Sequence, residues 1–237
     1  MRLAIALLTL TSLFVPVAAP AQTAVDPSGH WEGTIQAPEI DTKIEIDLTR
    51  DGSGALMGTF GQPGERLTGL ALSDFALNGT SIRFQIKGKP GERAFDGKLS
   101  ADGESITGSF TMQGFAMPFS LTRTGDAKIE APAASPRLTH ELVGSWNTTR
   151  EVRGTQVRLT LTMTNRPDGT SVASVLNVDE GLEIPASSIA QTGSTVTLEF
   201  KSLGGSYTGA VNSAGTELVG TFSQGAGSVP LTFRRAK

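Results

Sequence analysis

Apolar and polar residues alternate along most of the chain. In the segment "KIEIDLT" the apolar side chains of Ile44, Ile46 and Leu48 fall on one face of a strand, and the acidic Glu45 and Asp47 fall on the other. The same period of two recurs in "SIRFQIK", "VRLTLTM" and "STVTLEF". This period is typical of a β-strand with one face in a core and the other in solvent. The pattern therefore predicts an all-β protein.

Turn-forming dipeptides separate the alternating runs: Asp51-Gly52, Asn78-Gly79, Asp102-Gly103 and Asp168-Gly169. Such pairs tolerate positive φ and suit tight hairpins. Their spacing of about 8–12 residues predicts about eight short strands in each half of the chain. Consecutive hairpins favour an antiparallel meander, either a barrel or a sandwich, that closes on itself and so removes its free edges.

The two halves repeat one another. A shift of 112 positions places Phe95–Arg123 on Tyr207–Arg235 without a gap. Six positions are identical in this alignment: Gly97/Gly209, Gly103/Gly215, Gly108/Gly220, Phe110/Phe222, Pro118/Pro230 and Arg123/Arg235. Five further positions keep their apolar character. Internal duplication of one β-domain is the economical interpretation.

The repeat defines the expected domains. We expect a first β-domain at 22–123, a linker rich in Pro and Ala at 124–140, and a second β-domain at 141–237. Each domain would be lipocalin-like in outline, although far shorter than a lipocalin.

The N-terminus, 1–21, has the pattern of a signal peptide. Arg2 precedes an apolar run at Leu3–Val15, and Ala19-Pro20-Ala21 offers a cleavage site. We therefore expect export, to the periplasm or the medium, with cleavage near Ala21. Nothing later in the chain is long and apolar enough to predict a membrane span. Because the chain has no cysteine, neither a lipid on cysteine nor a disulfide is possible, and each domain must rely on its core.

Each copy opens with Gly-x-Trp and closes on an arginine. The residues are Trp31 and Arg123 in the first copy, and Trp146 and Arg235 in the second. A tryptophan on the first strand could stack on an arginine of the last strand and plug one end of a closed barrel, because a cation over an indole face is attracted to it. We predict a structural role for these four residues.

The order of these motifs resembles a known all-β domain, the one found N-terminal to the catalytic domain of many exported bacterial α/β-hydrolases. The resemblance rests on Gly-x-Trp, on "GLEIP" at Gly181–Pro185, and on "GGSYTGAVNSAGTELVGTFSQGAGSVPLTFRR". The second copy fits this pattern better, because the first has "GLALSDF" in place of the Ile-Pro motif. The resemblance implies two such domains in tandem, without the hydrolase domain.

We find no catalytic constellation and predict that the protein is not an enzyme. The chain has no G-x-S-x-G and no H-E-x-x-H motif, so neither the usual nucleophile elbow nor a zincin site is present. Of its two histidines, His30 is expected to face outward beside Trp31, and His140 lies at the end of the linker. Glu45 and Asp47 are interpreted as a solvated strand face. We predict no metal and no cofactor.

Charge argues against nucleic acid as a partner. The formal net charge is −3, with nine basic and thirteen acidic residues in 22–123 and eight of each in 141–237. Binding to nucleic acid or anionic lipid needs a basic surplus that neither half has.

The last hairpin of the first copy, "TMQGFAMPF", places Met112, Phe115 and Met117 near a turn. Apolar residues at an exposed tip suggest a docking surface. Alternatively, they cap the barrel or touch the other domain. The sequence therefore favours a non-catalytic binding or interaction protein for an unknown protein or an apolar small molecule. Two alternatives stay open: an accessory module of a secreted hydrolase, and a small lipocalin-like carrier of an apolar ligand.

Overall fold

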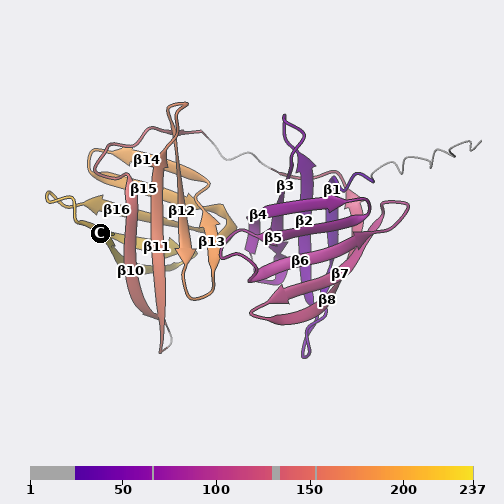
Figure 1. Cartoon of the computed structure of the whole chain (residues 1–237). Coiled ribbons are helices and arrows are strands. Elements are labelled where there is room, and N and C mark those ends of the chain that lie inside the picture. Colours follow the sequence, from indigo (N-terminus) through magenta and orange to yellow (C-terminus); the bar gives the residue numbers. More distant parts are fainter. Residues whose placement is uncertain (1–24, 66, 130–133, 153, 237) are drawn as a thin grey trace, which may run out of the picture.

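In a computed structural model the chain forms two antiparallel β-barrel domains in tandem, as predicted (Figure 1). The structure describes residues 25–65, 67–129, 134–152 and 154–236. The predicted signal peptide lies outside these residues. Helical structure within them is limited to two short 3-10 helices, η1 (Pro63–Glu65) and η2 (Lys201–Leu203). In the described part of the chain no helix has the length and apolar character that a membrane crossing requires.

The first barrel is a closed meander in which each strand pairs with the next and the last pairs with the first. Its strands are β1 (Gly29–Ile35), β2 (Thr42–Arg50), β3 (Leu56–Gln62), β4 (Leu67–Asn78), β5 (Ser81–Ile86), β6 (Arg93–Leu99), β7 (Ser105–Met112) and β8 (Phe115–Gly125).

The second domain is a nearly closed barrel with the same hairpin order. Its strands are β10 (Gly144–Val152), β11 (Thr155–Asn165), β12 (Thr170–Asn177), β13 (Leu182–Pro185), β14 (Ser188–Thr192), β15 (Thr195–Phe200), β16 (Gly205–Val211), β17 (Glu217–Gln224) and β18 (Gly227–Arg235). A further short strand, β9 (Ser135–Pro136), pairs with β12, so this sheet holds ten strands. The first and last strands again meet, but β13 and β14 lie at opposite ends of the strand order.

The segment predicted as a linker fills part of this gap. Within β9, Ser135 pairs with Ser171 of β12, and its Oγ accepts the N–H of Ile189 in β14 at 2.8 Å. Leu138 is buried in the core. The packed part of the second domain therefore begins before residue 141, because a short edge strand, which tolerates Pro136, is needed between β12 and β14. Residues 130–133 lie outside the described part.

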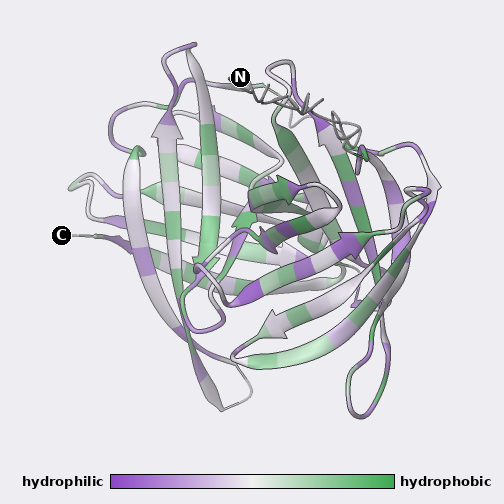
Figure 2. Cartoon of the chain, turned by 45° about the vertical axis from the view of Figure 1, so that its right-hand side comes forward, coloured by the Kyte–Doolittle hydropathy of each residue, from purple (hydrophilic) through white to green (hydrophobic). Residues whose placement is uncertain are grey.

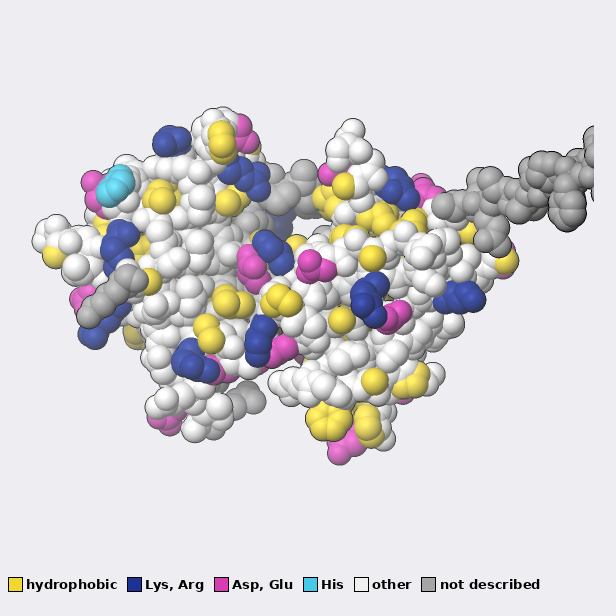
Figure 3. All heavy atoms as spheres, in the orientation of Figure 1, with side chains coloured by type: hydrophobic (Ala, Val, Ile, Leu, Met, Phe, Trp, Pro, Cys, Tyr) yellow, Lys and Arg dark blue, Asp and Glu magenta, His cyan; other side chains and the backbone are white. Residues whose placement is uncertain are grey.

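The first domain covers the outer edge of β13. Lys89 N–H donates to the Gly181 carbonyl at 2.9 Å, and Glu183 N–H donates to the Lys87 carbonyl at 3.0 Å, around an antiparallel bridge between Gly88 and Leu182. The Lys87 ammonium also lies 3.0 Å from the Glu183 carboxylate. Basic and acidic side chains meet where the two barrels adjoin (Figure 3). An edge strand that would otherwise present unpaired backbone groups is thus paired across the domains.

The predicted alternation is confirmed inside the barrels. Ile44, Ile46 and Leu48 are each no more than 1% exposed, and apolar and polar positions alternate along the strands (Figure 2). A cluster of phenylalanine side chains packs in the interior of the first barrel. The Phe95 ring lies 4.5–6.0 Å from the rings of Phe60, Phe84, Phe110 and Phe119.

Candidate functional site

The interior of the second barrel contains an apolar cavity of about 220 Å³. It is lined almost entirely by hydrophobic side chains of β11–β13, β15–β18 and η2, among them Leu159, Leu161, Val175, Ile184, Leu198, Phe200, Leu203, Tyr207, Phe222, Leu231 and Phe233. Since apolar cavities of this size bind apolar molecules, it is the candidate functional site.

The strand register explains why the cavity is in the second barrel. Phe84 lies opposite Phe95 in the first barrel, and Leu198 lies opposite Tyr207 at the equivalent place in the second. Likewise Phe119 opposite Gly108 corresponds to Leu231 opposite Gly220. Smaller aliphatic residues thus stand where the first barrel carries aromatic rings.

A third such change involves Phe60 of the first barrel, which lies opposite Ile46, itself the partner of Trp31. In the second barrel Trp146 lies opposite Leu161, and Leu161 lies opposite Val175, so Val175 is the counterpart of Phe60. Two changes run the other way: Leu121 and Ile86 correspond to Phe233 and Phe200, which form part of the cavity wall. Compared with the first barrel, the second therefore carries its aromatic rings at different positions, and the cavity lies between them.

Hydrogen bonds of its hydroxyl group hold the side chain of Tyr207 against the wall of the cavity. Tyr207 Oη lies 3.1 Å from the carbonyl oxygens of both Leu218 and Leu231. The one ring contact of Tyr207 among the described residues is edge-on to Phe233, at 5.4 Å between centroids. Burial raises the pKa of Tyr207 above its ordinary value, because the phenolate would lose its solvation.

The cavity has a polar rim. Arg150 of β10 and Asn177 at the end of β12 line it and are half-buried. The Asn177 Oδ1 accepts the N–H groups of Asp179 and Glu180, both at 3.2 Å. Within the described ranges no carboxylate forms an ion pair with Arg150. An apolar molecule with an acidic group would therefore meet a guanidinium beside the apolar space.

An arginine over a tryptophan occupies an equivalent place in both barrels, where the first and last strands pair. Arg123 lies directly opposite Trp31, with its guanidinium carbon 4.5 Å from the centroid of the tryptophan ring. Arg235 lies opposite Trp146 in the same way, at 4.1 Å. These contacts hold the closing strands of each barrel together.

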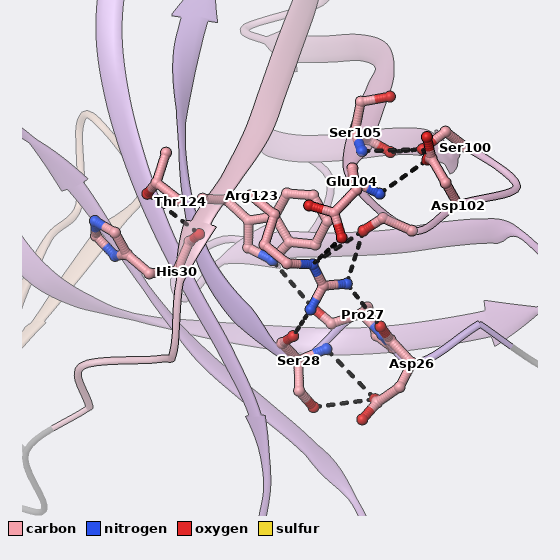
Figure 4. A network of polar contacts seen from close by, with 12 residues as sticks. Asp26, Pro27, Ser28, His30, Ser100, Asp102, Glu104, Ser105, Arg123 and Thr124 are labelled. Atoms are coloured by element: carbon pink, nitrogen blue, oxygen red, sulfur yellow. Dashed lines mark hydrogen bonds and ion pairs between the residues drawn. The ribbon is translucent and has the colours of Figure 1, made fainter.

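Backbone carbonyl groups surround each of these arginines, and Figure 4 shows this arrangement for Arg123. Arg123 donates to the carbonyls of Asp26, Ser28 and Gly103, and Arg235 donates to those of Glu141, Val143 and Gly215. The Gly-x-Trp glycines, Gly29 and Gly144, have positive φ, and a Cβ there would lie 3.0–3.1 Å from the arginine Nη1. The motif thus leaves room for the guanidinium.

The three residues of the predicted docking tip lie together in the β7–β8 hairpin, but their environments differ. Met112 pairs with Phe115 across the turn. Met112 and Met117 are partly buried against the core, whereas the Phe115 side chain is 75% exposed. The docking role stays a prediction, and it now concerns Phe115 above all.

His30 does not face solvent as expected. It is only 4% exposed, with Nδ1 2.8 Å from the Asp47 carboxylate and Nε2 3.4 Å from that of Glu32. The Asp47 carboxylate also accepts the backbone N–H of Lys128 at 2.8 Å. The outer face of β1 and β2 is covered because the chain that leaves the first barrel returns across it. In contrast, His140 is exposed.

The cavity residues were not singled out from the sequence. Their signal was present in the repeat, because the 112-residue shift already pairs Phe119 with Leu231. Phe60 and Val175 are related by a shift of 115 positions, the same shift that places Trp31 on Trp146, so this pair too could be read from the sequence.

No family model matches the chain, and no curated protein does. Two solved structures are similar to it. One is a protein of unknown function from the DUF3598 family of Nostoc punctiforme, with 16% identity over 88% of this chain and 96% of that chain, at a TM-score of 0.24. The other is a "putative outer membrane protein" of Bacteroides fragilis, with 9% identity over 89% of this chain and 98% of that chain, at a TM-score of 0.28. Neither description names a hydrolase, and the resemblance to the hydrolase-associated domain stays a prediction.

Proposed function

We propose that this protein is an exported, non-catalytic binding protein whose second barrel holds a small apolar molecule with an acidic group. The observation that carries the proposal is the apolar cavity of about 220 Å³, which lies where the first barrel packs aromatic rings. A barrel that served only as a scaffold would gain stability from filling this space, since empty volume in a core lowers the free energy of unfolding.

The size of the cavity limits the ligand. A volume of about 220 Å³ corresponds to roughly seven or eight atoms of carbon or oxygen size, since a water molecule occupies about 30 Å³ in the liquid. An eight-carbon chain is therefore near the upper limit. Burying such a chain contributes on the order of 6 kcal/mol, which corresponds to a Kd on the order of 10⁻⁵–10⁻⁴ M.

Arg150 gives the ligand its expected polarity. Arg150 lines the cavity, and a carboxylate that reached its guanidinium would gain a charge-assisted hydrogen bond. Medium-chain carboxylic acids combine both features. Of the alternatives that the sequence left open, this proposal corresponds to the small lipocalin-like carrier of an apolar ligand.

Native mass spectrometry of the protein purified from its own host tests this proposal. We expect a copurifying small molecule that is lost from the Val175→Phe variant, in which the side chain of the first barrel is restored. The Val219→Phe variant provides a matched control, because Val219 is 52% exposed. Retention of the same molecule by Val175→Phe would place binding elsewhere.

A second candidate function rests on Phe115. A phenylalanine that is 75% exposed at a hairpin tip is suited to dock against an apolar surface of a protein partner. A partner protein that copurifies with the wild type and is lost on Phe115→Ser, with the cavity ligand retained, would support this function. A hydrolase as that partner would favour the accessory-module alternative.

A further inference from the structure

A second, larger cavity lies between the two barrels. Its volume is about 780 Å³. One wall comes from β1–β4 of the first domain. The other comes from residues 185–188, Glu199, Lys201 and Ser202 of the second domain, with Lys128 and Ile129 of the connecting segment at its side. This interdomain cleft is separate from the cavity inside the second barrel, with which it shares no lining residue. The β15 strand lies between them, with Glu199 on the cleft side and Leu198 and Phe200 on the cavity side.

Carboxylates dominate the charge of the cleft. Glu32, Glu45 and Asp47 line the first wall and Glu199 the second, against the two lysines Lys128 and Lys201. Glu32 lies directly opposite Glu45 in the β1–β2 pair, an arrangement of like charges that destabilises a sheet unless a cation lies between them. His30 approaches Glu32, whereas no basic residue in the described ranges pairs with Glu45.

An independent observation comes from the opposite wall. Ser202 in η2 lines the cleft and is 6% exposed, yet its Oγ has no hydrogen-bond partner among the residues described. A buried hydroxyl without a partner destabilises the folded protein, because it has lost its hydrogen bonds to water. Because the Oγ itself is closed off from solvent, the side chain has to rotate about its Cα–Cβ bond before this hydroxyl accepts a hydrogen bond from a ligand in the cleft.

We propose that the interdomain cleft binds a small aliphatic polyamine. One ammonium group would lie between the Glu32 and Glu45 carboxylates, and a second would donate to Glu199 and to the Ser202 hydroxyl. Ile129, Pro185 and Ala186 also line the cleft and offer apolar surface to the methylene groups between the amines. A bare metal ion would be bound by the carboxylates but would make no contact of its own with the apolar surface.

Isothermal titration of the purified protein with spermidine tests this assignment. Glu45→Gln keeps the shape of the side chain and removes its charge, and it should weaken binding by about tenfold or more. Ser202→Ala should weaken binding by about fivefold, because one neutral acceptor is lost. Glu217→Gln is the matched control: Glu217 pairs with Arg234 at 3.2 Å outside the cleft, and its loss should leave affinity within about twofold.

Thermal melts of each variant verify that it folds. No binding of spermidine at millimolar concentration would overturn the proposal, as would an equal loss of affinity in Glu217→Gln, which would indicate attraction by net charge alone. Tighter binding of Mg²⁺ or Ca²⁺ than of spermidine would also overturn it in favour of a metal site. Leu198→Phe, which fills the barrel cavity, should leave spermidine affinity unchanged, so the two binding proposals fail independently.

Discussion

Phe84 and Leu198 occupy the same position in the two barrels. Phe84 lies opposite Phe95 with the ring centroids 5.0 Å apart, and Leu198 lies opposite Tyr207. In the first barrel the aromatic ring completes a stack that fills the interior. In the second, the smaller leucine forms part of the wall of an apolar cavity. One duplicated fold therefore has a packed copy and a hollow copy.

Leu198→Phe should stabilise the second barrel. Filling a cavity commonly raises the free energy of unfolding by about 0.5–2 kcal/mol, and we expect an increase in this range from urea unfolding followed by tryptophan fluorescence. A decrease of similar size would mean that the cavity cannot accept the ring without strain, and that the two sites are less equivalent than their register indicates.

The reciprocal change, Phe84→Leu, serves as the comparison for this experiment. It removes the ring that stacks on Phe95 at 5.0 Å and contacts Phe75 at 5.8 Å. Lost packing and lost aromatic contacts should lower the free energy of unfolding by about 1–2 kcal/mol.

Arg235→Lys should destabilise the second barrel. A lysine keeps the charge but cannot donate in the fixed fork that reaches the carbonyls of Glu141, Val143 and Gly215. We expect a loss of about 2–3 kcal/mol in the free energy of unfolding. Arg234→Lys is the matched control, because Arg234 is exposed and pairs only with Glu217 among the residues described. An equal loss of stability in the two variants would contradict a specific stabilising role of the Arg235 guanidinium.

Gly88→Ala should separate the two domains. A Cβ at this residue would lie 2.0 Å from the Gly181 carbonyl oxygen, inside the backbone bridge that joins the barrels. Small-angle X-ray scattering should therefore give a larger radius of gyration for Gly88→Ala than for the wild type. Gly64→Ala, where a Cβ has no neighbour within 4 Å, should match the wild type. An unchanged radius of gyration in both variants would contradict the role of this bridge.

The single tyrosine of the chain reports on the second barrel. Burial raises the pKa of Tyr207 above 10.0 in the folded state, so the folded protein holds this proton more tightly than the unfolded chain does. The resulting stabilisation is fully present below the unfolded pKa near 10 and is lost as the pH rises above it. Ultraviolet absorbance of the phenolate should therefore increase together with alkaline unfolding. Ionisation of Tyr207 near pH 10 in a protein that stays folded would mean that the barrel interior is open to water.

The all-β fold and the duplication could be predicted because they depend on local patterns. The alternation at Ile44, Ile46 and Leu48 marks a buried face whatever the partner strand is. The contact between Trp31 and Arg123 could be anticipated because a closed meander necessarily pairs its last strand with its first. Both inferences need only the order of the strands.

Other features depend on contacts between distant parts of the chain and were missed. His30 is buried because the segment at Lys128 crosses the outer face of its strand, which no local pattern encodes. Ser135 belongs to a short edge strand because β12 and β14 do not pair with each other, and the segment around Ser135 bonds to both. The cavity depends on which side chains share a layer of the barrel, as Phe60 and Val175 illustrate.

Titration of the protein with octanoate, followed by calorimetry, tests the central claim most directly. We expect the wild type to bind one octanoate with a Kd on the order of 10⁻⁵–10⁻⁴ M, Leu198→Phe to lose this binding, and Val219→Phe on the exposed face to retain it. Absence of binding by the wild type, or equal binding by wild type and Leu198→Phe, would contradict a ligand site in the second barrel.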